Sequence, residues 1–228
     1  AGNYNTQSLG GAVAGSLTDK LQARFSFNQF ISDGYMENVH LDKEDTNNFD
    51  ETLARAQFRI FANETNTVNI SLFKADINNG YDAYSLDNNR TTYSNKPGKD
   101  TQDTSALSIK WETKLSDSIN FEILASGSNT DSIYSYDEDW AFGEYTYNPD
   151  DPDYQEDPCD LTLGPCLAAV DGYSTEDYYF RENDRQSIDL RLISGAQGKL
   201  FNSTTDWVLG ITSQNRNESL FRDHTDAD

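Results

Sequence analysis

The chain has 228 residues and a formal net charge of -22, an acidity that excludes nucleic acid as a partner because phosphates require a basic surface. No run of residues approaches the about 18 consecutive apolar residues of a transmembrane helix. Membrane-spanning β-strands, which alternate polar and apolar residues, remain compatible with so hydrophilic a chain.

Alternating polarity predicts four β-hairpins. The decisive pair is LARAQFRIFA (53–62) and TVNISLF (67–73), which flank a short polar turn. The first run alone also suits a helix, but its β-branched partner and the turn between them favour a hairpin. In chain order, the predicted strand pairs are 9–17 with 21–27, 53–62 with 67–73, 107–112 with 119–126, and 188–192 with 207–211.

The connections between these eight strands alternate strictly in length. The turns within hairpins are short, whereas the links at roughly 33–50, 77–103 and 132–185 are long and polar. A soluble sandwich has no reason to place every long loop at one end, but an outer-membrane barrel does. We therefore predict an all-β fold: an incomplete segment of an antiparallel transmembrane β-barrel, with about eight meandering strands.

The two faces of such strands would meet different surroundings. Apolar side chains, many of them small, would contact lipid hydrocarbon, and polar side chains would border a wet lumen. Charges on the polar face need water or paired partners. The residues predicted to face the lumen are Arg24, Arg55, Arg59, Lys110, Glu112, Glu122, Asp189 and Arg191.

Aromatic residues collect near both ends of the predicted strands, as expected for two membrane interfaces. One group lies near the short turns and comprises Phe61, Trp111, Phe121 and Trp207. The other lies near the long loops and comprises Phe30, Tyr134, Tyr136, Tyr179, Phe180 and Phe221.

Two longer phrases resemble the barrel region of TonB-dependent outer-membrane receptors. They are SDGYMENVHLDKEDTNNFDETLARAQFRIFAN (32–63) and NNGYDAYSLDNNRTTYSNKPGKDTQDTSALSIKWE (78–112). The shared features are a DGY phrase followed by EN, a DE pair leading into an Arg-containing strand, and an NGYDAYSLDN loop followed by PG. The resemblance covers about the middle 90 residues, and the remainder fits by pattern only.

The resemblance implies a barrel of about 22 strands around a plug domain, energised through TonB. It further implies a Gram-negative outer membrane and uptake of a scarce nutrient such as a ferric siderophore, haem, cobalamin or an oligosaccharide. The chain starts at Ala1 and ends at RDHTDAD without a terminal aromatic residue. We therefore expect residues 1–228 to be part of one barrel domain, with the plug, the TonB box and other strands absent.

The predicted partners are outer-membrane lipid, the plug and TonB complex of the intact receptor, and a small nutrient ligand. Aromatic rings with an arginine at an external mouth could stack on a sugar or hold an anion. The candidate ligand-binding residues in the 77–103 loop are Tyr81, Tyr84, Arg90 and Tyr93. Packing within the loop is the alternative role for these four residues.

The long acidic loop offers two further candidate sites. Cys159 and Cys166, next to prolines in a polar stretch, are spaced for a small disulfide loop. Asp150, Asp151 and Asp153 are weak candidates for a calcium site, because the Gly of an EF-hand loop is missing and prolines interrupt the run. A solvated, self-repelling loop is the simpler interpretation.

No cofactor, catalytic motif or metal site is predicted, so we do not expect an enzyme. His40 and His224 have no His or Cys neighbour at ligand spacing and are interpreted as loop residues. Two other functions stay open. The chain could be a complete eight-stranded barrel acting as an anchor or adhesin, or a secreted β-sandwich that binds carbohydrate or calcium.

Overall fold

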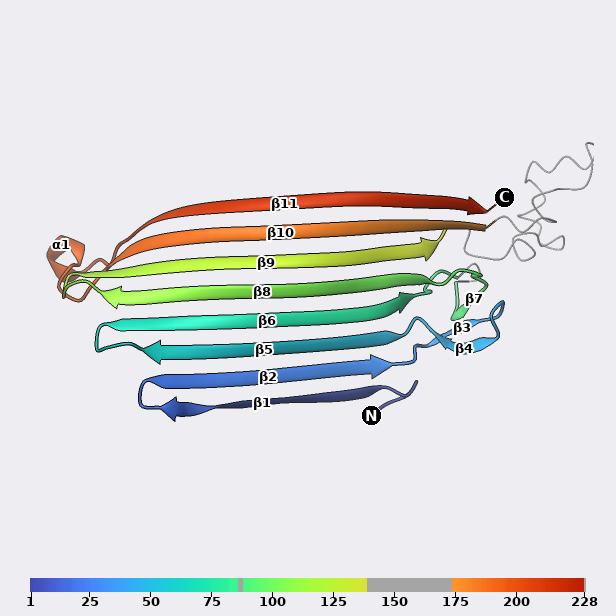
Figure 1. Cartoon of the computed structure of the whole chain (residues 1–228), viewed down its shortest axis with the longest axis horizontal. Coiled ribbons are helices and arrows are strands. Elements are labelled where there is room, and N and C mark those ends of the chain that lie inside the picture. Colours follow the sequence, from blue (N-terminus) through green and yellow to red (C-terminus); the bar gives the residue numbers. More distant parts are fainter. Residues whose placement is uncertain (86–87, 139–173, 228) are drawn as a thin grey trace, which may run out of the picture.

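The protein forms one antiparallel sheet of eight long strands, each pairing with its neighbours along the sheet (Figure 1). The computed structural model describes residues 1–85, 88–138 and 174–227. The strand order is β1-β2-β5-β6-β8-β9-β10-β11. Their bounds are β1 Gln7–Thr18, β2 Leu21–Ser32, β5 Phe49–Phe61, β6 Asn66–Tyr81, β8 Gly98–Lys114, β9 Ile119–Asp137, β10 Ser174–Ser194 and β11 Val208–Ala227.

The predicted alternation of short and long connections is confirmed. One end of the sheet carries the hairpin turns and the other, called here the loop end, carries the long links and both chain termini (Figure 1). The turn from β10 to β11 is the longest at its end and holds the short helix α1, Leu200–Ser203. Among the described residues, no helix has the length and apolar character needed to cross a bilayer.

The strands extend further toward the loop end than predicted. Much of the predicted long loops is strand, because β6 continues to Tyr81, β8 begins at Gly98 and β9 continues to Asp137. Polar residues dominate both faces in these extensions, so the alternation that marks a half-buried strand is missing there. Backbone pairing with the neighbouring strands continues regardless.

A second, small sheet at the loop end was not predicted. It consists of β3 (Met36–Asn38), β4 (Lys43–Thr46) and β7 (Thr91–Thr92), in the order β4-β3-β7. Gly34 at its entrance has φ of 104°, and a Cβ there would lie 1.9 Å from the carbonyl oxygen of Thr46. Only glycine fits this close approach.

Buried polar side chains hold the small sheet to the long strands. Asn38, which is fully buried, donates Nδ2 to Asp82 Oδ2 at 3.0 Å and to the carbonyl oxygen of Ser94 at 2.8 Å. Ser94 in turn donates Oγ to Asp137 Oδ2, at the end of β9, at 2.6 Å. Buried polar groups are tolerated when such bonds satisfy them.

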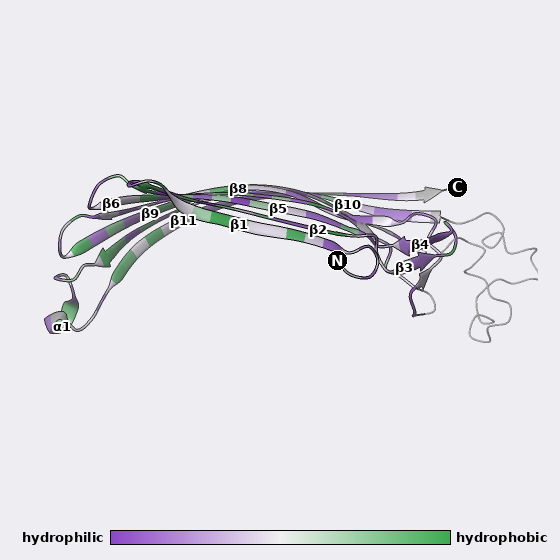
Figure 2. Ribbon diagram, turned by 90° about the horizontal axis from the view of Figure 1, so that it is seen from below, coloured by the Kyte–Doolittle hydropathy of each residue, from purple (hydrophilic) through white to green (hydrophobic). Residues whose placement is uncertain are grey.

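The long sheet has no hydrophobic core. In the described part of the chain, the buried apolar residues are Ala23, Met36 and Ala75, and the rest of the buried set is polar or charged. The eight strands form a single bent layer when seen edge-on (Figure 2). A sandwich requires two sheets packed about 10 Å apart through their apolar faces, so this arrangement excludes a sandwich within the described residues.

Strand pairing sorts the side chains into an apolar face and a polar face. On the apolar face, Phe58, Ile70, Ile109, Ala125 and Ile188 occupy one continuous cross-strand row. These positions are solvent-accessible, and 41% of Ile109 and 44% of Ile188 is exposed. A row of exposed aliphatic side chains on a sheet without a core needs an apolar environment outside the chain.

The apolar residues form a band that runs obliquely across the strands. On the loop side the last aliphatic residue on this face is Leu9 in β1 but Ile211 in β11. Following the strand pairing across the sheet, Leu9 stands level with Ser219, eight residues beyond Ile211. Eight residues correspond to about 26 Å along a strand, and seven strand spacings to about 34 Å, which gives a tilt of about 40°. Transmembrane barrel strands are tilted by about 35–45°.

A row of carboxylates borders this band on the loop side. Asp76, Asp103, Asp131 and Glu182 stand directly opposite one another on four adjacent strands, on the same side of the sheet as the apolar band. Lys74 forms an ion pair with Asp103. Like charges in direct register destabilise a sheet unless ions or water screen them, so this row requires an aqueous surrounding.

The small sheet should depend on Asn38. Replacing Asn38 with Leu removes both donated bonds and leaves buried acceptors without them, so local opening should become easier by about 1–3 kcal/mol. Hydrogen exchange at the amides of Glu37 and Val39, which bond across the small sheet, measures this opening. Asn28→Leu, at an exposed position, is the control. Equal protection in Asn38→Leu and the wild type would contradict the assigned role.

Candidate functional site

The most developed side-chain cluster lies on the polar face at the loop end. It contains Tyr81 from β6, Tyr134 and Tyr136 from β9, Tyr179 from β10 and Tyr84 from the segment after β6. We call these five residues the tyrosine cluster. They lie beyond the carboxylate row and therefore outside the apolar band.

A glycine lies where β8 approaches the β9 backbone closely, beside the cluster. Tyr81 pairs across the sheet with Gly98, the first residue of β8. The Tyr81 ring reaches over β8 and lies with its centroid 4.9 Å from that of Tyr134 on β9. A Cβ on Gly98 would lie 1.9 Å from the carbonyl oxygen of Ser135, so the position admits only glycine.

The rings meet mostly at steep or tilted angles. Centroid distances are 5.7 Å for Tyr81–Tyr84, 5.7 Å for Tyr84–Tyr136 and 5.7 Å for Tyr134–Tyr136. Tyr134 also lies 6.1 Å from Tyr179, its direct cross-strand partner. These distances fall within the range of favourable aromatic pairs and give a wall of ring faces and hydroxyl groups.

Burial raises the pKa of two phenols in the cluster. Desolvation raises the pKa of Tyr136 to about 12, with the nearby Tyr179 and Asp177 adding to the effect. Burial also raises the pKa of Tyr134 well above its usual value, supported by its hydrogen bond to Tyr81. At physiological pH the cluster therefore offers hydroxyl donors and acceptors but no negative charge.

An ion pair between the buried Asp177 and the half-exposed Arg222 adjoins the cluster. Arg222 donates Nε to Asp177 Oδ1 at 2.7 Å and Nη2 to Oδ2 at 2.6 Å, a two-point contact. The Tyr179 hydroxyl donates to Asp177 Oδ2 at 2.9 Å, and the Arg222 guanidinium lies 5.5 Å from the Tyr179 ring centroid. The hydrogen bond from Arg222 is the main reason that the pKa of Asp177 is lowered.

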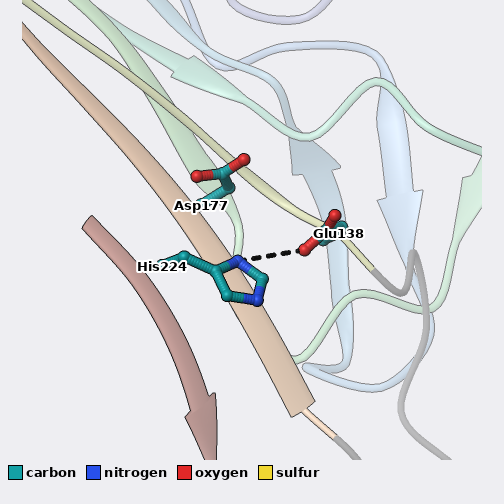
Figure 3. A group of neighbouring side chains, drawn as sticks. All are labelled: Glu138, Asp177 and His224. Carbon is teal, nitrogen blue, oxygen red and sulfur yellow. Dashed lines mark ion pairs between the residues drawn. The ribbon is translucent and has the colours of Figure 1, made fainter. Parts of the chain in front are cut away.

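Two further groups stand beside this pair. Glu138 Oε2 lies 3.1 Å from His224 Nδ1, and the Asp177 carboxylate lies close to both (Figure 3). Two carboxylates and one imidazole therefore lie together next to the tyrosine cluster.

The four predicted ligand-binding residues do not all lie together. Tyr81 and Tyr84 join the tyrosine cluster. Arg90 donates to the Tyr4 hydroxyl at 2.8 Å and lies 5.8 Å from the Tyr35 ring centroid, near the start of the chain. Tyr93 lies between β7 and β8. Ligand binding by these four residues stays a prediction.

The candidates in the acidic loop lie outside the described residues. They are the possible disulfide partners Cys159 and Cys166 and the weak calcium candidates Asp150, Asp151 and Asp153.

All eight residues predicted to face a lumen lie on the polar face. Several form ion pairs there: Lys110 Nζ lies 2.8 Å from Glu112 Oε1 and 3.2 Å from Glu122 Oε1. Arg191 donates Nε to Asp189 Oδ1 at 2.7 Å. Arg55 and Arg59 lie over Phe73 and Phe61 at 5.2 and 5.4 Å from the ring centroids. The full set is Arg24, Arg55, Arg59, Lys110, Glu112, Glu122, Asp189 and Arg191.

The predicted aromatic group at the loop end does not form one belt. Phe180 and Phe221 share the side of the apolar band, whereas Tyr134, Tyr136 and Tyr179 lie on the polar face. Counting alternate residues outward from the apolar positions of β9 and β10 would have assigned these faces. The sequence alone does not show that the strands extend this far.

A large hollow among the described residues is not near the tyrosine cluster. It has a volume of about 1230 Å³, lies over the apolar face, and is lined mainly by apolar residues such as Val13, Phe25, Leu72 and Leu107. It is open and contains few polar groups that converge on one point, so it lacks the orienting groups of a ligand site. We interpret it as part of the apolar band.

No protein-family model matches the chain, and no curated protein matches its sequence. Two solved structures are similar. The first is the ferric yersiniabactin uptake receptor FyuA from Yersinia pestis, with a TM-score of 0.71, 11% identity, and coverage of 98% of this chain and 30% of that one. The second is the outer membrane transporter YddB from Escherichia coli, with a TM-score of 0.42, 12% identity, and coverage of 97% and 32%.

The likeness to FyuA establishes the fold. Nearly the whole chain superimposes on less than a third of that receptor, so the chain spans about 30% of its length. With the open eight-stranded meander, this confirms the predicted class: an all-β, incomplete segment of an antiparallel transmembrane barrel, with short turns at one end and long loops at the other.

The tyrosine cluster should respond to alkaline pH. The raised pKa values stabilise the folded cluster. This stabilisation is complete at pH values below about 10, the ordinary pKa of tyrosine, and is lost as the pH rises through about 12. Ultraviolet absorbance of phenolate during a titration should show a late group of tyrosines, with loss of structure at the loop end. Ionisation of all thirteen tyrosines in a single step near pH 10 would contradict this picture.

Proposed function

We propose that the chain is part of the barrel wall of an outer-membrane receptor that takes up a scarce small nutrient. The observation that carries the proposal is the exposed, oblique apolar band on a sheet with the fold of part of FyuA. A band inclined at about 40° to its strands fits a bilayer crossed by tilted strands. The polar face then borders an aqueous interior, and the loop end faces the outside.

Ligand capture is assigned to the tyrosine cluster. Its rings, hydroxyl groups and neighbouring Arg222 form a surface on the lumen side of the loop end, where an incoming solute arrives first. Neutral phenols stack on planar or sugar-like ligands and donate hydrogen bonds, and an arginine attracts anionic ones. A siderophore, haem, cobalamin or oligosaccharide would fit this chemistry, with binding and gated passage but no covalent step.

The intact receptor would supply the remaining parts. A plug domain inside the barrel and the TonB complex are the proposed partners, together with outer-membrane lipid. A complete eight-stranded barrel is less well supported, because β1 and β11 lie at opposite edges of the sheet and do not pair. In lipid, two open edges would leave backbone groups unsatisfied, so further strands must continue the wall.

The orientation of the two faces can be tested with paired spin labels. Leu107 and Ser108 are neighbours in β8 on opposite faces. In the full-length protein in lipid bilayers, a label at Leu107→Cys should be reached by lipid-soluble oxygen. A label at Ser108→Cys should be reached by a water-soluble nickel chelate instead. Ile70→Cys and Ser71→Cys repeat the comparison in β6. Water access at both members of each pair would overturn the barrel-wall assignment.

The ligand-capture role can be tested with two neighbouring tyrosines. Tyr179 belongs to the tyrosine cluster, whereas Tyr178 lies on the other face and stacks on Phe180 at 5.8 Å. Tyr179→Ala should weaken nutrient binding by about 1–2 kcal/mol, roughly tenfold, and Tyr178→Ala should not. The measurement is growth-supporting uptake, followed by binding to the purified receptor. Equal effects of the two variants would contradict a specific role of the polar face.

A further inference from the structure

Three potential metal ligands meet at the loop end from three adjacent strands. Glu138 directly follows β9, Asp177 lies in β10 and His224 lies in β11. Asp177 and His224 are direct cross-strand partners, and the Glu138 amide donates to the carbonyl oxygen of Thr175 at 3.1 Å. Strand pairing therefore fixes the positions of all three backbones, independently of their side chains.

We propose that Glu138, Asp177 and His224 bind one divalent transition-metal ion of the zinc class. One ligand atom from each residue lies within 4.8 Å of the others, and Glu138 Oε2 and His224 Nδ1 are already 3.1 Å apart (Figure 3). Donors around tetrahedral zinc at about 2.0–2.2 Å lie about 3.3 Å from one another. The Glu138 and His224 atoms are already at this separation, so these two exposed side chains have to shift together toward the Asp177 carboxylate.

The surroundings of Asp177 prepare it for this role. Its side chain is fully buried, and Arg222 and Tyr179 hold the carboxylate in one orientation. Oδ2 accepts from Arg222, Tyr179 and more distantly Tyr136, whereas Oδ1 accepts from Arg222 alone among the described residues. Each carboxylate oxygen has two lone pairs, so Oδ1 can accept a metal while Arg222 stays bound. Arg222 is a positioning residue, like the groups that orient metal-bound carboxylates elsewhere.

The donor set selects the class of ion. An imidazole with two carboxylates suits zinc and its neighbours, whereas calcium prefers six or more oxygen donors. About 37% of the His224 side chain and 40% of Glu138 is exposed, so an ion can enter from solvent. The sequence alone predicts His224 to be a loop residue, because Glu138 and Asp177 lie 86 and 47 positions before it and give no local ligand spacing.

The ion would tie together the ends of three strands next to the tyrosine cluster. The remaining coordination position would face the polar side of the sheet and hold water. Metal binding at these three residues does not depend on nutrient uptake.

Titration calorimetry with zinc on the full-length protein in detergent tests the proposal. The background carries Cys159→Ser and Cys166→Ser, so that thiolates of the acidic loop do not contribute. We expect one equivalent of zinc to bind, with affinity lowered at least tenfold in His224→Ala and in Glu138→Gln. His40→Ala, which removes the other histidine of the chain, should bind as the background does. Cobalt bound in place of zinc should show visible bands without thiolate charge transfer.

Misfolding is controlled by Glu138→Gln, which keeps the size and a hydrogen-bonding atom next to His224. Its circular dichroism and amide protection in β10 should match the background. Absence of zinc binding in the background would overturn the proposal. Unchanged affinity in His224→Ala, or an equal loss in His40→Ala, would do the same.

Discussion

The continuous ladder of backbone hydrogen bonds is the constraint on which the rest of the structure depends. A globular domain is held together mainly by buried apolar side chains, but here the long sheet buries almost none. The strands are ordered because each pairs with its neighbours, over up to twenty residues in β10 and β11. A shift of one residue in any pair would exchange the two faces beyond it. The register therefore determines which side chains form the apolar face and which form the polar face.

The same register assembles the candidate sites. Asp177 and Arg222 come from strands that are adjacent in the sheet, and Tyr81 reaches Tyr134 across the start of β8. The polar side chains at the loop end consequently have fixed neighbours although no hydrophobic core lies beneath them. Ion pairs, ring contacts and buried hydrogen bonds hold this end, and the membrane holds the other part of the sheet in the proposed setting.

The sequence predicted the fold better than the site. Alternation over Leu107 to Trp111 and Ile119 to Ala125 identified strands correctly, because there one face is uniformly apolar. The signal stopped where β8 and β9 leave the apolar band, so their outer ends were assigned to loops. The short strands of the small sheet were missed because side-chain hydrogen bonds, such as those of Asn38, hold them instead of a periodic pattern. Tyr136, Tyr179 and Arg222 could not be grouped without the strand register.

The oblique band and the carboxylate row together have a mechanical consequence. Asp76, Asp103, Asp131 and Glu182 would lose their hydration if the sheet sank toward the turn end, and the aliphatic rows would enter water if it rose. Either displacement costs several kcal/mol. In the proposed membrane setting, the sheet is thus held at one depth in the bilayer.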